Sequence, residues 1–513
     1  MILNRLKFIF LRYFLGINTP RRLIHFAVKS HGNQVVLLDG NAQFTMEDLN
    51  RNVNKLCNAL LTLGIQKGDC IGVLMQNRKE FIEVRLASYK CGFVFCALID
   101  DFTPEQIVET LNETNCRILI YDERLTLENL KQLVNFTNLK FFIPVDGQKG
   151  IRSYHNLIKN SNDSEPQTKI TPDEISAIGF TSGTTGKSKG IVWTHKAWLY
   201  SFYHLLLNSN SSAGMIFLHA IPFSTAGSLA ILPVLASGAR NILMRSFDAK
   251  NVAGVIDREK VTNLILPPAF LIELWDFYAN NKAMYDFKSL KNISVGSAIL
   301  PGNKWKEMMS DFGPILQQSY GMAEVLAPIA SLKISDPGTE KHKLTSVGKV
   351  INQVKIKLKE VDAAGQPFPE RSRMGIIYLR SKTCGVGYLG QERLTQQHFQ
   401  KGWFATTDIG RLDENGNLHI IERAANIFKH KGVSIIPREI EEIIHCFKGV
   451  KEALVTKMDD DLVAYVSARR NLQIDLNQLE EFCKNHISAE KVPSKYVLLD
   501  CLPHSTSGKI LRN

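Results

Sequence analysis

The sequence predicts an α/β protein in which a large N-terminal domain of parallel-sheet βα subdomains precedes a small α+β C-terminal domain. Three observations support this expectation. Short apolar runs alternate with amphipathic stretches between Val35 and Gly390, which is typical of parallel strands covered by helices. The 513-residue chain is 44% hydrophobic and 22% charged, a globular composition long enough for several core-bearing units. After Glu422, helix-like and strand-like runs alternate in a compact tail.

The N-terminal part contains a regular series of helix and strand signals. Thr45 opens a capping box with Asp48 before apolar residues recur at helical spacing, which predicts a helix. Thr103 is a predicted N-cap, and Pro104 follows at the first helical position. The expected strands are VVLLDG (35–40), CIGVLM (70–75), FVFCALID (93–100), RILIY (117–121) and AIGF (177–180). In such sheets, ligands bind at the loops beyond the carboxyl ends of the strands.

The decapeptide TSGTTGKSKG (181–190) follows the last of these runs and is suited to holding phosphate. Its glycines let the backbone approach an anion, its free N–H groups form an anion-binding nest, and its hydroxyls and lysines add donors and charge. It is not a P-loop of the form G-x-x-x-x-G-K-[ST], because Thr181 stands where that motif requires its first glycine. A solvated polar loop is the alternative for an isolated segment of this composition.

The charge balance and the cysteines narrow the class of partner. Sixty-two Lys and Arg against 50 Asp and Glu give a net charge of +12, which favours polyanionic ligands or a membrane surface. The sequence has no DNA- or RNA-binding signature and no long basic run, so nucleic acid is not an expected partner. The nine cysteines include no C-x-x-C pair, which fits a reducing cytoplasm and neither a disulfide framework nor a zinc site.

Residues 1–18 form a basic, apolar extension in which Phe and Leu are interrupted by Arg5, Lys7 and Arg12. No apolar run approaches the ~20 residues that span a bilayer, and a signal-peptide cleavage site is not evident. Two interpretations stay open. The extension is either a helix packed on its own domain or an interfacial helix that makes a cytoplasmic protein peripherally membrane-associated.

Three further motifs follow: QQSYGMAE (317–324), GWFATTDIGRLDENGNLHIIER (402–423) and LPHSTSGKILRN (502–513). Together with TSGTTGKSKG, in this order and with these gaps, they closely resemble the adenylate-forming superfamily, which includes acyl-CoA synthetases, peptide-synthetase adenylation domains and luciferases. The resemblance runs from about Thr19 to the C-terminus. It implies an N-terminal domain (19–421) that holds ATP and an acid, a hinge (422–426), and a mobile C-terminal domain (427–513) that carries a catalytic lysine.

The resemblance implies an AMP-forming acid–thiol ligase with two half-reactions. A carboxylate attacks the α-phosphate of ATP to give acyl-AMP and pyrophosphate, and a thiol of coenzyme A or phosphopantetheine then attacks the acyl carbon and releases AMP. Because two anions meet in the first step, cations and N–H donors must stabilise the developing charge. Lys509 matches the family's catalytic lysine, which bridges the carboxylate and the α-phosphate. Glu324 matches the carboxylate that holds Mg²⁺ against the phosphates.

Further nucleotide-binding roles come from the same resemblance. The decapeptide matches the loop that embraces the β- and γ-phosphates, and Lys189 matches its lysine. Tyr320 is expected to stack on adenine, and Asp408 and Arg423 to grip the ribose, while the backbone of VGSAIL (295–300) lines the adenine. The implied nucleotide-binding residues are Thr181, Ser182, Gly183, Thr184, Thr185, Gly186, Lys189, Gly296, Ser297, Ala298, Tyr320, Gly321, Asp408 and Arg423.

The family's C-terminal domain rotates between the two half-reactions, and the resemblance places the pivot at residues 423–426. Lys429 and Gly432 match the face presented during thiol transfer, where a glycine lets a pantetheine arm pass close to the backbone. The chain departs from the family pattern at five positions. These are Ser188 for proline, Ser224 for histidine or an aromatic residue, Ala323 for threonine or serine, Thr407 for glycine, and Ala425 for aspartate or lysine.

The apolar segments FSTAGSLAILPVL (223–235) and LPPAFLIELW (266–275) predict a roomy pocket for a fatty or aromatic acid. The leading expectation is a medium- or long-chain fatty acid joined to coenzyme A. Two alternatives stay open. One is an acyl-AMP ligase that loads the phosphopantetheine of an acyl carrier protein. The other is a degenerate member that binds nucleotide or acyl ligand without turnover, because Ala323 removes a donor worth ~10²-fold at a developing charge.

Overall fold

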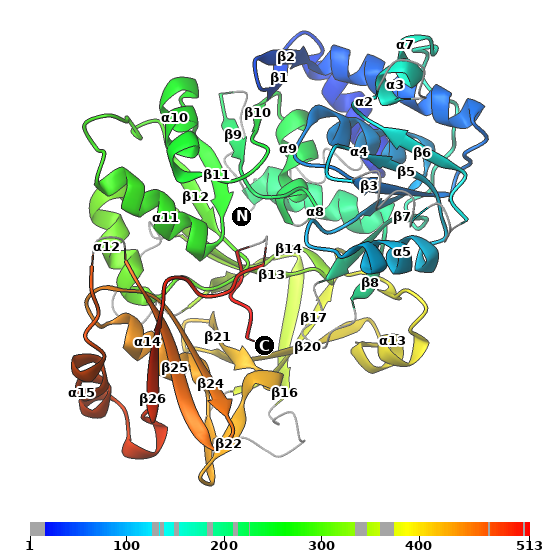
Figure 1. Ribbon diagram of the computed structural model, residues 1–513. Coiled ribbons are helices and arrows are strands. Elements are labelled where there is room, and N and C mark those ends of the chain that lie inside the picture. The colour runs from blue at the N-terminus through cyan, green and yellow to red at the C-terminus, as the bar shows by residue number, and fades with distance from the viewer. Residues whose placement is uncertain are drawn as a thin grey trace.

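The structure is a computed structural model, which describes residues 16–125, 133, 138–147, 153–181, 188–208, 214–224, 226–333, 346–359, 374–469, 472–505 and 508–512. It confirms an α/β fold with a large N-terminal domain and a small C-terminal domain. In Figure 1 the strands of a seven-stranded sheet lie at the right, a larger sheet extends from the upper left through the centre, and the C-terminal strands lie at the lower left.

The seven-stranded sheet confirms the strands expected in residues 70–121 and 177–180. Its strands, in order across the sheet, are β18 (Gly387–Tyr388), β8 (Lys189–Thr194), β7 (Ile175–Thr181), β4 (Val94–Ala97), β3 (Cys70–Leu74), β5 (Cys116–Tyr121) and β6 (Phe141–Pro144). The strands from β7 to β6 pair in parallel, whereas β8 and β18 pair antiparallel at one edge. The parallel pairing brings the carboxyl ends of the central strands to one edge, where the decapeptide follows β7.

The larger sheet has fourteen strands and combines a parallel half with an antiparallel half. Its parallel half, in order, is β13 (Leu316–Met322), β12 (Asn292–Val295), β11 (Asn263–Leu266), β9 (Ile216–His219), β10 (Arg240–Leu243) and β1 (Val35–Asp39), with β2 (Ala42–Thr45) antiparallel at the edge. Its antiparallel half is β16 (Val354–Lys359), β17 (Met374–Ser381), β20 (Trp403–Leu412), β21 (Asn417–Arg423), β15 (Gly348–Val350) and β14 (Val325–Lys333), with β19 (Phe399–Gln400) beside β20.

The helices begin where the sequence signals predict. Thr45 forms the capping box with Asp48 at the start of α3 (Met46–Thr62). Thr103 caps α5 (Pro104–Glu113), with Pro104 at its first position. The other helices of the N-terminal domain are α2 (Pro20–His31), α4 (Lys79–Cys91), α7 (Tyr154–Lys159), α8 (His195–Asn208), η2 (Ala226–Ala230), α9 (Ile231–Ala236), α10 (Ala249–Glu259), α11 (Pro268–Ala279), α12 (Gly302–Phe312) and α13 (Glu392–His398).

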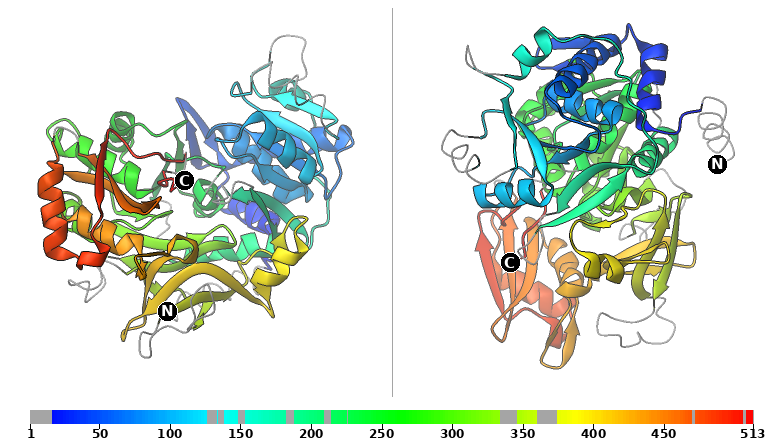
Figure 2. Two further views of the ribbon diagram at one scale, coloured as in Figure 1. Left: turned by 60° about the horizontal axis from the view of Figure 1, so that its bottom comes forward. Right: turned by 90° about the vertical axis from the view of Figure 1, so that its right-hand side faces the viewer.

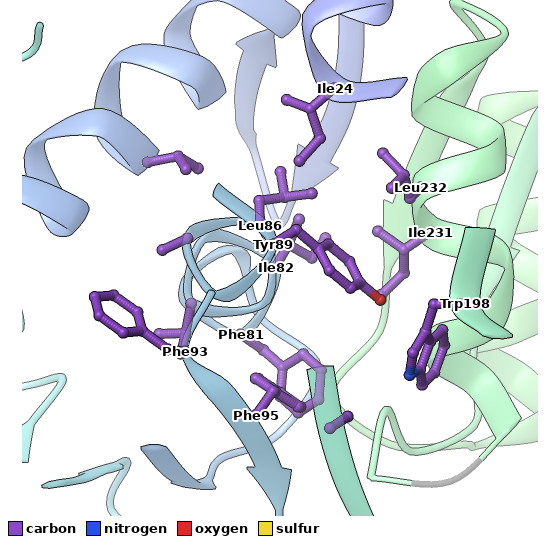
Figure 3. Packing of buried hydrophobic residues seen from close by; sticks show 14 of the residues in the cluster. Ile24, Phe81, Ile82, Leu86, Tyr89, Phe93, Phe95, Trp198, Ile231 and Leu232 are labelled. Carbon is purple, nitrogen blue, oxygen red and sulfur yellow. The ribbon is translucent and has the colours of Figure 1, made fainter. Parts of the chain in front are cut away.

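Helix α4 lies inside the N-terminal domain, and all its residues are buried. Figure 3 looks along α4 and shows Ile24 of α2, Trp198 of α8, and Ile231 of α9 around it. Such a helix loses its polar surface to the core, so each of its charged side chains needs a partner inside the protein. Lys90 has such partners, because its Nζ lies 2.6 Å from the side-chain oxygen of Asn54 and 2.5 Å from Glu165.

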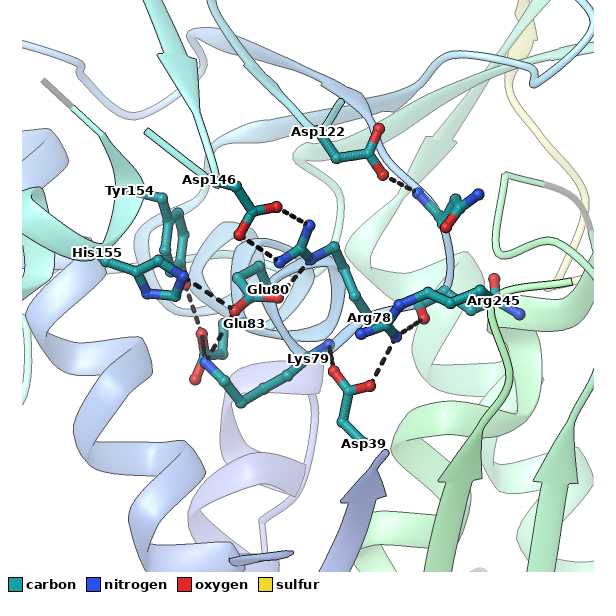
Figure 4. A network of polar contacts seen from close by, with 12 residues as sticks. Asp39, Arg78, Lys79, Glu80, Glu83, Asp122, Asp146, Tyr154, His155 and Arg245 are labelled. Carbon is teal, nitrogen blue, oxygen red and sulfur yellow. Dashed lines mark hydrogen bonds and ion pairs between the residues drawn. The ribbon is translucent and has the colours of Figure 1, made fainter. Parts of the chain in front are cut away.

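A polar network joins the start of α4 to the larger sheet (Figure 4). The carboxylate of Asp39, at the end of β1, accepts a hydrogen bond from the Lys79 N–H at 2.9 Å and pairs with Arg245 at 2.6 Å. The Lys79 ammonium pairs with Glu83 at 2.7 Å, and Glu83 also accepts from the hydroxyl of Tyr154 at 2.6 Å. These contacts fix α4 against the carboxyl end of β1.

The C-terminal part consists of two small sheets with two packed helices. Its elements are η3 (Ala424–Asn426), β22 (Phe428–His430), β23 (Val433–Ile435), α14 (Pro437–His445), β24 (Val450–Met458), β25 (Asp461–Ala468), α15 (Leu476–His486), η4 (Ala489–Lys491) and β26 (Lys495–Leu499). Strands β22 and β23 form a hairpin, while β24, β25 and β26 form a three-stranded sheet with its own apolar core. The last residues turn back from β26 toward the middle of the molecule, as Figure 1 and Figure 2 show.

The proposed N-terminal extension falls mostly on residues 1–15, which lie outside the described residues. Ile17 is buried, and its carbonyl accepts a hydrogen bond from the hydroxyl of Tyr203 at 2.5 Å. Within the described part of the chain, no helix has the length and apolar character needed to cross a membrane. Membrane contact through residues 1–18 therefore stays a prediction.

Three of the nine cysteines, far apart in the sequence, meet inside the seven-stranded sheet. The sulfur atoms of Cys70, Cys96 and Cys116 all lie within 4.8 Å of one another, on three neighbouring strands. All nine cysteines are free thiols in the structure. The sequence spacing contained no sign of this cluster, because it depends on strand register.

Candidate active site

The carboxyl ends of parallel strands β11, β12 and β13 form one edge of the site. β12 leads into Gly296, Ser297 and Ala298, the segment predicted to line the adenine. Ser297 has φ +68°, a left-handed conformation that strains a residue other than glycine. The side chains of Ser297 and Ala298 are exposed, so this turn presents its backbone outward.

Gln318 of β13 holds this turn in place, a role that the sequence did not reveal. Its side-chain amide donates to the carbonyls of Ala298 at 3.1 Å and Val295 at 3.3 Å. Its carbonyl accepts from the N–H of Leu300 at 3.1 Å. One buried amide therefore satisfies both sides of a strained turn, which explains how the turn keeps its shape.

Tyr320, Asp408 and Arg423 meet although nearly ninety residues separate the first two. The Tyr320 hydroxyl donates to Asp408 Oδ2 at 2.5 Å, and Arg423 Nε lies 3.6 Å from Asp408 Oδ1. Asp408 and Arg423 are register partners on β20 and β21. Burial and the adjacent Asp408 carboxylate raise the pKa of Tyr320 well above its usual range. The phenol therefore stays a neutral donor that fixes the aspartate.

Glu324 lies in the turn between β13 and β14 and is held by a residue that sequence reasoning missed. The hydroxyl of Tyr388 donates to Glu324 Oε1 at 3.0 Å, and burial together with Glu324 raises the pKa of Tyr388. The ammonium of Lys189 lies 5.9 Å from the centre of the Tyr388 ring. This arrangement brings the predicted phosphate-loop lysine and the predicted Mg²⁺ carboxylate to the same tyrosine.

The loop that carries Lys509 is packed against the large domain. Gly508 has φ +73°, and a Cβ added there would lie 2.6 Å from Cγ of Pro267, which precedes α11. The loop closes through hydrogen bonds from Ser505 N–H to the Lys509 carbonyl at 2.9 Å and from Gly508 N–H to the Ser505 carbonyl at 2.8 Å. Close approach and backbone conformation both require glycine at position 508.

Two ion pairs anchor the same C-terminal segment to the small domain. His504 Nε2 lies 2.7 Å from Glu452, and the hydrogen bond with this carboxylate raises the pKa of His504. Arg512 forms a two-pronged pair with Glu441, at 2.9 and 2.8 Å. The segment between these anchors reaches across to Pro267, so the Lys509 loop connects the two domains.

The electrostatic environment of Lys509 links it to the residues already described. Lys509 is exposed, and partial desolvation by neighbouring protein atoms, followed by the charge of Arg423, lowers its pKa. Asp408 and Glu324 act in the opposite direction. The ammonium therefore lies within electrostatic reach of the predicted ribose and Mg²⁺ residues, where a cation can neutralise developing negative charge.

Lys429 and Gly432 do not join this group in the conformation described. Both are exposed on the β22–β23 hairpin, whose two-residue turn has positive φ at Lys431 (+47°) and Gly432 (+83°). Positive φ at both positions is typical of a type I′ hairpin turn, which accounts for the glycine by itself. Figure 1 shows β22 at the bottom of the small domain, away from the strand ends of the large sheet.

The predicted phosphate loop is described only at its two ends. Residues Ser182, Gly183, Thr184, Thr185 and Gly186 lie outside the described residues, and Thr181 is described only as the last residue of β7. Thr181 pairs with Lys189 at the start of β8, so the loop joins two adjacent strands. Gly321, exposed at the end of β13, lies between Tyr320 and the Glu324 turn.

Comparison with known proteins decides the family. The sequence profile of AMP-binding enzymes matches residues 24–389, and the profile of the AMP-binding enzyme C-terminal domain matches residues 439–509. The chain belongs to the AMP-binding enzyme family. This confirms the resemblance to adenylate-forming enzymes.

The curated relatives of this family member include ligases of several acids. A 2-succinylbenzoate–CoA ligase from Geobacillus sp. (strain WCH70) is 27% identical, with 94% of each chain covered. A 4-coumarate–CoA ligase from Solanum tuberosum is 26% identical over 93% of this chain and 89% of that protein. A medium/long-chain-fatty-acid–CoA ligase, FadD8, from Mycobacterium tuberculosis is 26% identical over 94% of this chain and 87% of its own.

Solved structures of AMP-binding enzymes share the fold of this chain. The anthranilate CoA ligase AuaEII in complex with anthranoyl-AMP superimposes with a TM-score of 0.88 at 22% identity, covering 96% of both chains. O-succinylbenzoate coenzyme A synthetase from Bacillus subtilis, in complex with AMP, gives a TM-score of 0.81 at 23% identity, over 96% of this chain and 97% of its own. The two-domain α/β architecture is therefore that of known ligases.

Three departures from the AMP-binding enzyme pattern have a clear structural setting. Thr407 is exposed on β20 and is not among the described residues with positive φ, so this position does not require glycine. Ala323 packs against the main apolar core beside Glu324. Ser224 donates to Asp100 at 2.9 Å, and Asp100 also pairs with Arg124 at 3.0 Å. The serine is thus part of a polar contact between the two large sheets.

Proposed function

We propose that this AMP-binding enzyme activates an aryl carboxylic acid as its adenylate and transfers the acyl group to coenzyme A, releasing AMP and pyrophosphate. The observation that carries the proposal is the proximity of Tyr320, Asp408, Arg423, Glu324 and the Lys509 loop, next to the carboxyl end of β13. The parallel-sheet edge is the expected place for a ligand. CoA ligases among the curated relatives support the acceptor.

In this proposal the chain's own residues hold and neutralise the reacting groups. Asp408, fixed by Tyr320 and Arg423, accepts hydrogen bonds from the ribose hydroxyls. The aromatic face of Tyr320 packs on the adenine beside the Ser297 turn. Lys509 supplies positive charge to the carboxylate and the α-phosphate, and Lys189 supplies it to the outer phosphates.

Glu324 fits a Mg²⁺ ligand. It is a partly exposed carboxylate with one oxygen fixed by Tyr388 at 3.0 Å, and Mg²⁺ in such sites needs only one or two carboxylates in addition to phosphate and water oxygens. When bound, the ion supplies charge neutralisation for the phosphates. Glu324 would hold the ion, and Tyr388 orients Glu324.

An aryl acid replaces the fatty acid expected from the sequence. The relatives named for 2-succinylbenzoate and 4-coumarate are 26–27% identical to this chain, and FadD8, named for medium- and long-chain fatty acids, is 26% identical. The segment expected to line the acyl pocket contains Phe223, whose ring lies 5.2 Å from Phe81 and 5.2 Å from His219. These rings are buried and belong to the core that supports the segment, so the aryl assignment rests on the relatives named for aryl acids.

The acceptor and the domain movement belong to the same proposal. The small domain presents Lys509 for adenylation and presents Lys429 and Gly432 for thiol transfer after rotation about residues 423–426. In the described conformation Asn426 is tied back to Glu422 at 2.7 Å, and the Arg423 N–H to the same carboxylate at 2.8 Å. Breaking these local contacts releases the pivot without disturbing either core. A carrier-protein phosphopantetheine is the alternative acceptor.

The test is pyrophosphate release from ATP with a panel of aryl and fatty acids, with and without coenzyme A, and with mass spectrometry of the products. We expect an aryl acid to give the highest kcat/KM and an acyl-CoA product. Fatty acids as the best substrates would contradict the aryl assignment. Nucleotide binding without turnover of any acid would favour the non-catalytic alternative.

A further inference from the structure

Arg469 joins the small domain to two helices of the large domain. It directly follows β25, and its backbone N–H donates to the carbonyl of Gly449 at 2.8 Å, which fixes the base of its side chain within the small domain. Its guanidinium donates to Asp276 of α11 from Nη2 at 2.6 Å and from Nε at 3.2 Å, and to Glu307 of α12 from Nη1 at 2.8 Å. In Figure 1, α11 and α12 lie directly above the strands of the small domain. We call Arg469 with these two carboxylates the Arg469 latch.

Trp275 of α11 gives the arginine a flat surface. Cζ of Arg469 lies 4.2 Å from the centre of the Trp275 ring, a cation–π distance. The indole N–H donates to Asp311 Oδ2 at 2.7 Å, and Asp311 also pairs with Lys282, so the ring is held from within the large domain. A planar guanidinium can stack on a ring and donate from its edges at the same time, whereas an ammonium is a compact point charge. The contact therefore requires arginine and not only a positive charge.

The latch and the Lys509 turn dock the small domain at two points along one helix. The Lys509 turn approaches Pro267, immediately before α11, whereas Arg469 binds Asp276 near the other end of that helix. From Pro267 to Asp276 the helix rises about 13 Å. Two contacts this far apart fix the orientation of the small domain as well as its position, and thereby the direction from which Lys509 approaches the site.

The latch can open without leaving a buried charge behind. The side chains of Arg469 and Asp276 are 19% and 13% exposed, and separation of the domains gives both of them more water. Glu307 is 40% exposed and also lies 3.8 Å from Lys304 Nζ of its own helix, so it keeps a cation when Arg469 leaves. Partly exposed ion pairs are of modest strength, unlike fully buried pairs, whose separation is costly. A contact of this strength suits a domain that leaves its position once in every catalytic cycle.

We propose that Arg469 is a positioning residue for adenylation, which docks the small domain along α11 so that Lys509 lies at the site, and which releases it for thiol transfer. This inference rests on the proposed function, because it assigns one contact to one of the two states of that ligase. The partners of Arg469 belong to α11 and α12 and not to the nucleotide site, so Arg469 acts through Lys509. Its loss should lower the fraction of docked molecules and leave the chemistry of the docked state unchanged.

The test measures the two half-reactions separately in full-length wild-type and Arg469→Gln enzymes. We expect kcat for acyl-AMP formation to fall by ~10-fold, the lower end for hydrogen bonds to a charged group, with KM for ATP little changed. Conversion of preformed acyl-AMP to acyl-CoA should keep its rate or increase, because the small domain is released more easily. Arg469→Lys keeps the charge without the planar fork and should restore part of the adenylation rate.

Arg117→Gln is the matched control. Arg117 is 27% exposed and pairs with Asp69 at 3.1 Å inside the large domain, so its loss should leave both half-reactions at the wild-type rate. Asp276→Asn weakens the latch from the other domain and tests the proposal if Arg469→Gln does not fold. It should slow adenylation by a smaller factor, and the double variant should lose less than the product of the two single losses, because both changes act on one contact.

Spin-label distances provide a readout that needs no turnover. Labels at Ser434→Cys of the small domain and Met284→Cys of the large domain, with Cys446 and Cys501 changed to serine, should report one distance population with ATP alone. Adding Arg469→Gln should produce a second, undocked population. Equal losses in both half-reactions, an unchanged adenylation rate, or a single docked population in Arg469→Gln would overturn this inference while leaving the aryl-acid ligase intact. Absence of pyrophosphate release by the wild-type enzyme with every aryl acid would overturn the proposed function, and the distances would still decide whether Arg469 docks the small domain.

Discussion

Two glycine turns of the C-terminal domain have the same backbone conformation and opposite surroundings. Gly508 has φ +73° and Gly432 has φ +83°, so each turn favours glycine for its backbone alone. A Cβ at Gly508 would lie 2.6 Å from Pro267, whereas a Cβ at Gly432 would have no atom within 4 Å. Only the Lys509 turn is pressed against the large domain.

This difference shows which face of the small domain is turned toward the large domain in the described conformation. The Lys509 turn lies within electrostatic reach of Asp408 and Glu324, while the hairpin with Lys429 projects away from the strand edge. By resemblance to the family, this hairpin carries the residues expected to act in thiol transfer, and it is exposed in the described conformation. A domain that rotates between the two half-reactions requires such a second, exposed face. Variants of the two turns should therefore affect different half-reactions.

The largest expected effect comes from removing the ammonium group of Lys509, in the turn that is packed against the large domain. Lys509→Ala should lower acyl-AMP formation by ~10²–10³-fold, because a cation at the developing charge contributes about 3–4 kcal/mol to the transition state. Conversion of preformed acyl-AMP to thioester should persist. ATP–pyrophosphate exchange and single-turnover thioester assays measure the two steps. Lys484→Ala, at an exposed position of α15, is the control, and equal losses in both steps would contradict the assigned role.

The next largest effect is expected at Asp408, which is hydrogen-bonded to the buried Tyr320 near the Lys509 turn. Asp408→Asn replaces the carboxylate that Tyr320 and Arg423 hold, which should raise KM for ATP by ~10–10²-fold, the usual cost of a charge-assisted hydrogen bond. Tyr320→Phe keeps the ring and should have a smaller effect. An unchanged KM in Asp408→Asn, measured by pyrophosphate exchange, would remove Asp408 from the nucleotide site.

The two glycines allow a direct test of the comparison. Gly508→Ala should slow adenylation by ~10-fold, because the new methyl group overlaps Pro267 and moves the Lys509 turn off the large domain. Gly432→Ala strains its turn equally but meets nothing, so adenylation should keep its rate. Bulkier Gly432→Leu should impair only the thioester step. Parallel losses of adenylation in both alanine variants would mean that backbone strain alone is being measured.

The smallest effect is a shift in the pH profile. Desolvation and Arg423 lower the pKa of Lys509, so adenylation, which needs the protonated lysine, should decline with rising pH sooner than an ordinary lysine would allow. Arg423→Gln removes a like charge and should move this decline to higher pH, while Asp408→Asn removes an opposite charge and should move it to lower pH. Profiles of kcat/KM for ATP provide the measurement, and shifts of the opposite sign would refute the electrostatic assignment.

The local elements of the fold could be predicted from the sequence, while the polar contacts between distant segments could not. The capping residues Thr45 and Thr103 act on neighbours within one turn, so their sequence signals are sufficient. The motif around Tyr320 pointed to a nucleotide site. Its bond with Asp408 depends on sheet order, which spacing alone does not determine.

Some residues that hold the site in place lie outside the sequence motifs, and nothing in the sequence indicated their role. Tyr388, which holds Glu324, occupies a two-residue edge strand, and Gln318 resembles any polar strand residue until its bonds to the Ser297 turn are seen.

The most direct test of the two-face account measures the distance between the open hairpin and the large domain. Spin labels at Ser434→Cys, exposed on the same hairpin, and at Met284→Cys, an exposed site of the large domain, can be placed in a chain with Cys446 and Cys501 changed to serine. With ATP alone we expect one distance population, that of the packed Lys509 turn. A stable acyl-AMP mimic with coenzyme A should produce a second population, in which the hairpin has moved relative to the large domain. A single unchanged distance under both conditions, with thioester still formed, would contradict the account.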